Sequence, residues 1–222
     1  KKAYPGVPVM IYVNSYADCK AEADVVCTSA NAVKIAMAMP GKQIIFVPDI
    51  YFARNLAAEL KGKKEVICPE SHGSLCEVHE KFTLEDLKAV RESFDIPKGH
   101  PKRMLYAHWE CMPEVLAEAD FHGSTSEIRR DIALRVNSLE RAFVASECEL
   151  TANLSQEFPT VKFWTACSVR CSHMAKVTLE KIYDVLLAID KGDGLAEYEI
   201  ILEERVMDLA RKPIMKMFEI GG

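Results

Sequence analysis

The chain has 222 residues, of which 49% are apolar and 27% are charged, and its formal net charge is −5. This composition is typical of an ordinary globular protein, and the acidic balance gives no reason to expect nucleic acid or an anionic membrane as a partner. No apolar run approaches the roughly 20 residues that cross a bilayer, and no signal peptide opens the sequence, so we expect a cytoplasmic protein.

The first half of the sequence predicts three strand–helix units in succession. Residues 7–13 are almost all apolar, which is typical of a strand buried on both faces of a parallel sheet. A helix over residues 29–39 would end at Pro40 and Gly41, a strong breaker pair. Further strands are predicted at residues 44–47 and 65–68, and further helices at residues 55–60 and 83–91. This order predicts a small three-layer α/β lobe with right-handed crossovers.

The second half repeats the pattern after a predicted linker at residues 94–102. Its predicted strands lie at residues 104–107, 142–145 and 161–164, and its helices begin near Pro113, Ser126, Thr151 and Thr178. Residues 203–218 have helical spacing, although Pro213 should break or kink that helix. We therefore expect α/β lobes at residues 1–93 and 94–192, followed by a C-terminal helical tail at residues 193–222.

A sequence repeat supports this duplication. Cys76 and Cys171 are each separated by six residues from a Thr-Leu-Glu that opens a predicted helix, and each Thr is a candidate N-cap. Ala-Glu-Ala-Asp occurs at residues 21–24 and again at residues 117–120. A period of about 95 residues indicates duplicated domains rather than a solenoid.

The two cysteines are candidate metal ligands because they occupy matching points of the repeat. Small buried side chains are the equally weighted alternative for Cys76 and Cys171. Thiolates suit zinc or an iron–sulfur cluster. Two thiolates are too few for a closed site, but a third equivalent repeat would supply a third and leave one metal position open.

Other polar residues are predicted at the carboxyl ends of the strands, where α/β units bind ligands. His108 and Glu110 would share one side of a strand, so they could transfer protons together or form a surface ion pair. Hydroxyl groups cluster where helices begin, and they could cap those helices or bind a phosphate or carboxylate. The candidates are Tyr12, Asn14, Ser29, His79, His108, Glu110, Ser124 and Thr125.

Several segments together resemble the quinolinate synthase family, and the resemblance covers nearly the whole chain. The segments are Tyr-Val-Asn-Ser-Tyr-Ala at 12–17, Lys-Ala-Glu-Ala-Asp at 20–24, Cys-Thr-Ser-Ala-Asn-Ala at 27–32, Cys-Glu-Val-His-Glu at 76–80, His-Trp-Glu-Cys at 108–111 and Gly-Ser-Thr-Ser at 123–126. The resemblance implies a pseudo-threefold protein in which three α/β lobes surround a [4Fe–4S] cluster with one open iron. It also implies the condensation of iminoaspartate with dihydroxyacetone phosphate to quinolinate, with loss of phosphate and water, in NAD biosynthesis. L-aspartate oxidase would be the source of iminoaspartate.

Carried over by motif, the resemblance implies a role for each candidate residue. Cys76 and Cys171 would be cluster ligands, the open iron would act as a Lewis acid, and Glu110 would serve as the acid/base. His79 would line the cavity. The groups that hold the substrate's phosphate and carboxylates would be Tyr12, Asn14, Ser29, His108, Ser124 and Thr125, of which Tyr12 and His108 would also take part in catalysis.

The sequence departs from the family pattern at three loop positions and in its extent. Glu77, Trp109 and Ser172 stand where the family usually has Pro. The family's first lobe, with its cysteine, is missing, so we expect a fragment that comprises the second and third lobes and is inactive alone. An alternative is a non-catalytic metal or iron–sulfur module that another chain completes. A zinc hydrolase is disfavoured, because no His-rich triad or HExxH spacing occurs.

Overall fold

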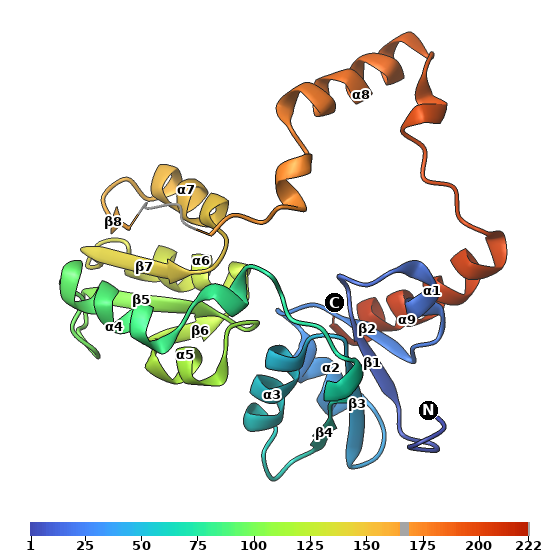
Figure 1. Cartoon of the computed structure of the whole chain (residues 1–222), viewed down its shortest axis with the longest axis horizontal. Coiled ribbons are helices and arrows are strands. Elements are labelled where there is room, and N and C mark those ends of the chain that lie inside the picture. The colour runs from blue at the N-terminus through green and yellow to red at the C-terminus, as the bar shows by residue number, and fades with distance from the viewer. Residues whose placement is uncertain (165–168, 222) are drawn as a thin grey trace.

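Two parallel β-sheets of four strands each form the centre of the structure (Figure 1). We describe residues 1–164 and 169–221 of a computed structural model. The strand order is β2-β1-β3-β4 in the first sheet and β6-β5-β7-β8 in the second, so one topology is used twice. The predicted α/β class is therefore confirmed, whereas the pseudo-threefold arrangement stays a prediction.

The first sheet is built from short apolar strands that are joined by helices. Its strands are β1 (Val9–Tyr12), β2 (Val25–Cys27), β3 (Gln43–Val47) and β4 (Glu65–Ile67). The helices of this part are α1 (Ala17–Ala21), α2 (Ala32–Ala38), α3 (Ile50–Glu59) and α4 (Leu84–Ser93), with 3₁₀ helices η1 (Glu70–His72) and η2 (His79–Lys81) before α4. Strands β1 and β3 lie in the middle of the sheet, which is why their sequences are nearly continuous apolar runs.

The second sheet repeats this order. Its strands are β5 (Arg103–His108), β6 (Phe121–Gly123), β7 (Arg141–Ala145) and β8 (Lys162–Phe163). The remaining helices are α5 (Pro113–Glu118), α6 (Thr125–Arg135), α7 (Cys148–Glu157), η3 (Met174–Lys176), α8 (Leu179–Lys191), η4 (Leu195–Glu197) and α9 (Glu204–Gly221). The predicted strand at residues 161–164 corresponds to β8.

The sequence analysis missed one strand in each lobe, and the reason is length. Strands β2 and β6 have three residues each, too few to show a hydrophobic period. In both sheets this short strand pairs with the central strand, so that Tyr12 lies opposite Cys27 and His108 lies opposite Gly123. Tyr12 and His108 thus occupy the same place in the two lobes.

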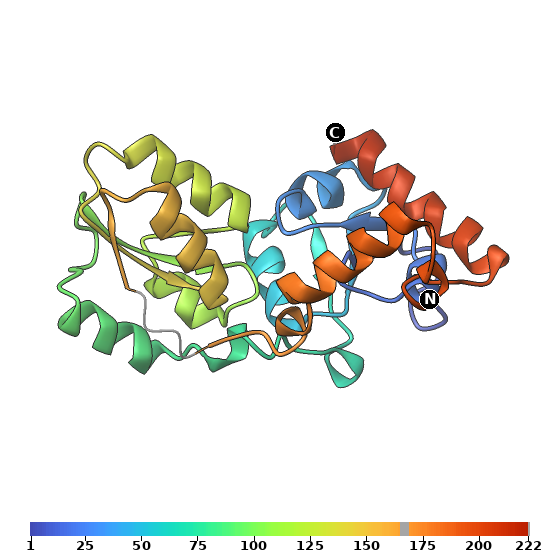
Figure 2. The same cartoon turned by 90° about the horizontal axis from the view of Figure 1, so that it is seen from above.

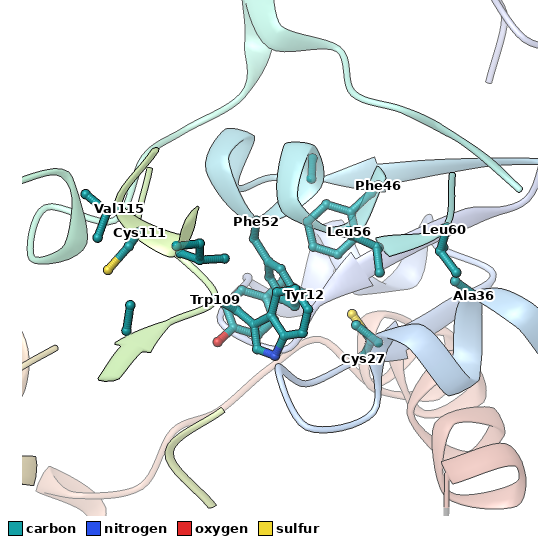
Figure 3. Packing of buried hydrophobic residues seen from close by; sticks show 14 of the residues in the cluster. Tyr12, Cys27, Ala36, Phe46, Phe52, Leu56, Leu60, Trp109, Cys111 and Val115 are labelled. Atoms are coloured by element: carbon teal, nitrogen blue, oxygen red, sulfur yellow. The ribbon is translucent and has the colours of Figure 1, made fainter. Parts of the chain in front are cut away.

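One buried apolar cluster joins the two lobes (Figure 3). It contains Phe52 on helix α3 together with Trp109 and Cys111, which follow strand β5. The rings of Phe52 and Trp109 are 6.1 Å apart. The side chain of Asn55 donates hydrogen bonds to the carbonyl groups of Trp109 and Cys111, both at 2.8 Å. The lobes are therefore held together by shared core packing as well as by the chain between them.

Helix α4 follows the first sheet in sequence but packs against the second. Its Leu87 is fully buried in the same cluster as Leu105 and Phe143 of the second sheet. The guanidinium group of Arg91, only 9% exposed, pairs with Glu118 at 2.5 Å and with Asp120 at 3.1 Å.

Helix α9 returns to the first lobe, where it packs against α1, α2 and β2. Residues 204–221 form one helix that continues through Pro213, so of the two predicted effects of this residue, a break or a kink, the break is wrong. Pro213 is buried with Ala210 and Met217 on the face toward the lobe, and this packing offsets the hydrogen bond that proline cannot make.

Helix α8, between the second lobe and α9, lies apart from both sheets (Figure 1). It crosses above the first lobe when the molecule is seen from above (Figure 2). None of its residues is buried, and its apolar side chains are exposed, Leu179 by 80% and Leu186 by 59%. None of the described helices has the length and apolar character that a membrane span needs.

Candidate active site at the carboxyl ends of the strands

Two histidines and a carboxylate meet in a buried group where the two lobes join. The carboxylate of Glu110 lies 3.2 Å from Nδ1 of His108 and 3.4 Å from Nδ1 of His79. The two imidazole rings stack, with their centroids 4.6 Å apart. All three side chains are less than 10% exposed, so the structure brings together the predicted histidine–carboxylate pair and adds His79 to it.

Cys76 completes this group with a thiol. Its Sγ is 3.1 Å from Nδ1 of His79, and one ligand atom each from Cys76, His79 and Glu110 lie within 4.8 Å of one another. The other ring nitrogen of His79 lies 3.1 Å from the hydroxyl of Ser146, which orients the ring. Sulfur, imidazole and carboxylate at this spacing could hold a transition-metal centre.

Burial changes the acidity of the groups around this centre. It raises the pKa of Cys76 to about 11, and the Glu110 charge adds to this effect. Burial and the neighbouring His108 hold the pKa of His79 well below its ordinary value, so this ring is neutral. Burial also raises the pKa of Tyr12, although a hydrogen bond with Ser29 opposes the shift. Tyr12 and Cys76 therefore hold their protons until a metal or a substrate displaces them.

Each cysteine is fixed by a carboxylate that the sequence analysis did not identify. Asp49 follows β3, and its two oxygens accept the backbone N–H groups of Phe52 at 2.6 Å and Cys76 at 3.2 Å. Glu147 follows β7 and does the same for Glu149 at 2.6 Å and Cys171 at 3.2 Å. We name these two arrangements the carboxylate bridges.

The loops that carry the two cysteines touch each other. The carboxylate of Glu77, next to Cys76, accepts hydrogen bonds from the backbone N–H of Ser172 at 3.1 Å and from its hydroxyl at 2.7 Å. The same carboxylate lies 4.0 Å from the sulfur of Cys171. Glu77 and Ser172, two of the three positions at which the resemblance implies departures from the family, are therefore partners in one contact.

Trp109, the third departure, fills the junction between the lobes. Its ring lies 5.0 Å from that of His122 in addition to its contact with Phe52, and it is 9% exposed. A side chain of this size adds apolar surface to the shared core directly beside Glu110.

The remaining candidate residues differ in their exposure and in their hydrogen-bond partners. Ser124 caps helix α6 in a capping box with Glu127, so its hydroxyl is already hydrogen-bonded to the helix. Thr125 is exposed. Ser29 is half-buried beside Tyr12. Asn14 is exposed and lines a cavity of the first lobe together with Val9 and Ile11. The substrate-binding roles of these residues stay predictions.

The donor set of the two cysteine loops fits a thiolate-bound metal centre. Cys76 and Cys171 are both free thiols, are both half-buried, and both pack against the same core cluster. The sulfur of Cys171 lies 3.5 Å from the backbone nitrogen of Met174, which donates a hydrogen bond to it. This chain therefore offers two thiols, with His79 and Glu110 beside the first.

The structure thus defines a duplicated α/β protein with a histidine–carboxylate–thiol centre where the two lobes meet. Residues 1–219 match the family described as Quinolinate synthetase A protein, and the chain belongs to this family. It is 35% identical to the quinolinate synthase of Caulobacter vibrioides over 99% of this chain and 55% of that protein. The quinolinate synthase of Xylella fastidiosa is 34% identical over 99% of this chain and 59% of its own length. Quinolinate synthase 1 of Mesorhizobium japonicum is 39% identical over 84% of this chain and 53% of its own length. The chain therefore spans between half and three-fifths of the length of these relatives.

Proposed function

We propose that this chain forms two of the three lobes of a quinolinate synthase, which condenses iminoaspartate with dihydroxyacetone phosphate to quinolinate with loss of phosphate and water. The observation that carries the proposal is the buried contact of Glu110 with His79 and His108 beside Cys76. A third lobe would supply a third cysteine. L-aspartate oxidase would supply iminoaspartate in the cytoplasm.

Cys76 and Cys171 would hold a [4Fe–4S] cluster together with the third cysteine. When bound, the cluster supplies a Lewis acid through its open iron. The carboxylate bridges support this assignment, because each fixes the backbone of one of the two ligands. The Glu77–Ser172 hydrogen bonds support it too, since they keep the two ligand loops together.

Proton transfer would depend on the side chains of this chain. Glu110 accepts a proton from the substrate and passes it to the imidazole of His108, whose Nδ1 lies 3.2 Å from the Glu110 Oε2 atom. Burial and the neighbouring His108 lower the pKa of His79, so this ring stays neutral and holds the Glu110 carboxylate in place from 3.4 Å. Tyr12, with its raised pKa, stays a phenol and donates a hydrogen bond to a substrate oxygen.

An anaerobic reconstitution of the chain together with the missing lobe tests the proposal. We expect an iron–sulfur absorbance and quinolinate formation, and we expect Glu110→Gln to lower turnover by about 10²- to 10⁴-fold with the iron content unchanged. Iron that binds without any quinolinate formation would favour a non-catalytic cluster-binding module. Full turnover by Glu110→Gln would remove Glu110 from catalysis.

A further inference from the structure

Helix α4 contacts the second sheet through an apolar face and an arginine. Leu87 and Phe82 belong to the same buried cluster as Leu105 of β5 and Phe143 of β7. The Phe82 and Phe143 rings are 6.3 Å apart in an edge-on arrangement. Arg91, at the end of the same helix, closes the contact through its ion pairs with Glu118 and Asp120.

The corresponding face of the first sheet is not covered by a helix equivalent to α4 in the part of the chain that the structure describes. Val9 pairs with Ile45 in the first sheet as Leu105 pairs with Phe143 in the second, so the two pairs are equivalent. Around this first pair lies a cavity of about 920 Å³, lined also by Ile11, Val47 and Pro48 and bordered by the N-terminal residues of the chain. Most of the face that α4 covers in the second lobe therefore borders a cavity in the first.

The acidic partners of Arg91 are also repeated in the first lobe. Asp120 accepts the backbone N–H of Leu105 at 2.8 Å, and Asp24 accepts that of Val9 at 2.7 Å. Glu22 stands where the repeat has Glu118. Glu22 and Asp24 are exposed, and in the part of the chain that the structure describes neither forms an ion pair, whereas Glu118 and Asp120 share Arg91.

We infer that this cavity, together with Glu22 and Asp24, is a docking surface for an amphipathic helix that carries an arginine and belongs to a further α/β lobe of the same fold. The docked helix would place its apolar side chains on Val9 and Ile45 and its guanidinium group on the two acids. The length of the relatives leaves room for such a lobe. The inference rests on the proposed three-lobe enzyme and assigns the place where its third lobe attaches.

Helix α8 is the obvious competitor, because it is the repeat equivalent of α4 and its apolar side chains are exposed. A second copy of this chain could offer it to the cavity. However, the position of Arg91 in α4, eight residues after the capping Thr83, is occupied in α8 by Leu186, eight residues after Thr178. Leucine would leave the charges of Glu22 and Asp24 unpaired, so charge complementarity favours the arginine-bearing helix.

Docking of this kind would also bring a metal-ligating side chain of the further lobe to the active site. In the second lobe, the segment before α4 brings Cys76 and His79 to the ends of the strands, where His79 contacts Ser146. Pro48 precedes Asp49 in the first lobe as Ser146 precedes Glu147 in the second, and it lines the cavity. A helix docked in the same way would bring its own preceding loop close to Asn14.

A peptide with the sequence of residues 79–98 serves as the probe, because it contains α4 and both of its flanks. Fluorescence anisotropy measures its binding to the full chain, and a version tethered to Lys1 by a Gly/Ser linker raises its effective concentration. We expect saturable binding and, for the tethered form, slower amide exchange in β1 and β3. We expect Arg91→Glu in the peptide to weaken binding by about tenfold or more, and Glu22→Lys in the chain to restore it.

Three results would overturn the inference. One is an unchanged amide exchange of β1 and β3 with the tethered peptide. Another is equal binding by the Arg91→Glu peptide, which would show apolar adhesion only. The third is tighter binding of a peptide of residues 174–194, which would identify α8 of a second copy as the occupant. None of these results depends on cluster formation, so they are distinguishable from a failure of the proposed activity.

Discussion

At the scale of single residues, the carboxylate bridges of Asp49 and Glu147 are the feature that most needs explanation. Burial raises the pKa of Asp49 to about 7, with a further contribution from Glu110, so this carboxylate sits in an environment that resists its charge. It is nevertheless used twice, once for the N-terminus of α3 and once for the loop of Cys76. The same double use recurs at Glu147. This repetition indicates that the bridge is an element of the site and not only a helix cap.

Asp49→Asn should weaken metal binding at the Cys76 group. An amide oxygen can accept only one of the two N–H groups, and the amide NH₂ would face the other, which leaves a buried donor unpaired. With Co²⁺ as an optical probe of Cys76, His79 and Glu110, we expect about tenfold weaker binding. Glu147→Gln is the matched control, because Glu147 bridges to Cys171 and not to Cys76. Equal Co²⁺ affinity in all three proteins would contradict the positioning role of Asp49.

The sequence allowed part of this site to be predicted. His108 and Glu110 were expected on one side of a strand, and the structure brings them together because β5 persists to His108. Asp49 and Glu147 were missed because an acid after a strand is common and gives no local signal. The repeat was the available signal, since each acid follows the second central strand of its lobe. The contact between Glu77 and Ser172 could not be predicted at all, because it depends on how two distant loops meet.

At the scale of elements, helix α4 shows how a charged residue can join two lobes. Burial alone would raise the pKa of Glu118, but hydrogen bonds from Lys98 and Arg91 outweigh it and lower the pKa. Arg91 also donates to the carbonyl groups of Ile96 and Glu118, so every nitrogen of its guanidinium group makes a hydrogen bond. The helix is therefore held by its apolar face and by a cation with several partners.

The stability of this junction should depend on pH in the acidic range. Because the pKa of Glu118 is lower in the folded protein than in the unfolded chain, its contribution to the free energy of unfolding is present above the ordinary glutamate pKa of about 4.3. That contribution is lost as the pH falls through the folded-state pKa. Urea unfolding from about pH 6 to about pH 3 should show a smaller loss in Glu118→Gln than in the wild type. Glu114→Gln, at an exposed position of the same helix, should leave the pH dependence unchanged.

Helix α2 depends on a lysine from a distant part of the chain. The ammonium group of Lys64 donates to the carbonyl groups of Ala36 and Met39, which end the helix and would otherwise be unpaired. Lys64 is only 8% exposed. Such a contact is a long-range helix cap. The breaker pair Pro40 and Gly41 predicts where the helix ends, but it does not show which donor pairs with the last carbonyl groups of the helix.

Lys64→Met should lower the free energy of unfolding by about 1–3 kcal/mol, because the apolar side chain keeps the packing but leaves the carbonyl groups without a donor. Urea denaturation followed by circular dichroism measures the change. Lys63→Met is the matched control, since Lys63 is exposed and precedes Lys64 directly. A loss of the same size in the Lys63 variant would mean that the general charge, and not the cap, is responsible.

The elements themselves were predictable to different degrees. The buried central strands and the well-capped helix α4 were expected within a few residues of where they lie, because hydrophobic runs and capping boxes are local signals. The start of α3 at Ile50 was not expected, since it depends on the capping carboxylate of Asp49. The continuity of α9 through Pro213 was not expected either, because packing against another part of the chain decides it.

At the scale of the whole molecule, the second lobe lies in sequence between α4, which packs on the second sheet, and α9, which packs on the first lobe. The chain leaves the first lobe through α4 and returns to it through α9. Between the second lobe and α9, residues 192–203 and helix α8 are almost entirely exposed. The duplicated architecture was predictable from the repeat of the cysteine and Ala-Glu-Ala-Asp motifs. The return of α9 was not, because an amphipathic pattern does not say which surface its apolar face will cover.

A single cut after Lys191 should therefore leave the molecule in one piece. The free segment would stay attached because Ala210, Pro213 and Met217 remain buried on the first lobe. Limited trypsin treatment followed by gel filtration and mass spectrometry should find both fragments in one peak. The variant Met217→Asp is expected to release the C-terminal fragment, whereas Met215→Asp, at an exposed position of the same helix, should not.

The position of α9 also has a consequence for synthesis on the ribosome. The surface formed by α1, α2 and β2 is translated before the second lobe, whereas the helix that covers it, residues 204–221, is translated after that lobe. The first lobe must therefore wait, partly uncovered, while the whole of the second lobe is made. Nascent chains stalled before residue 204 should expose this apolar surface to chaperones.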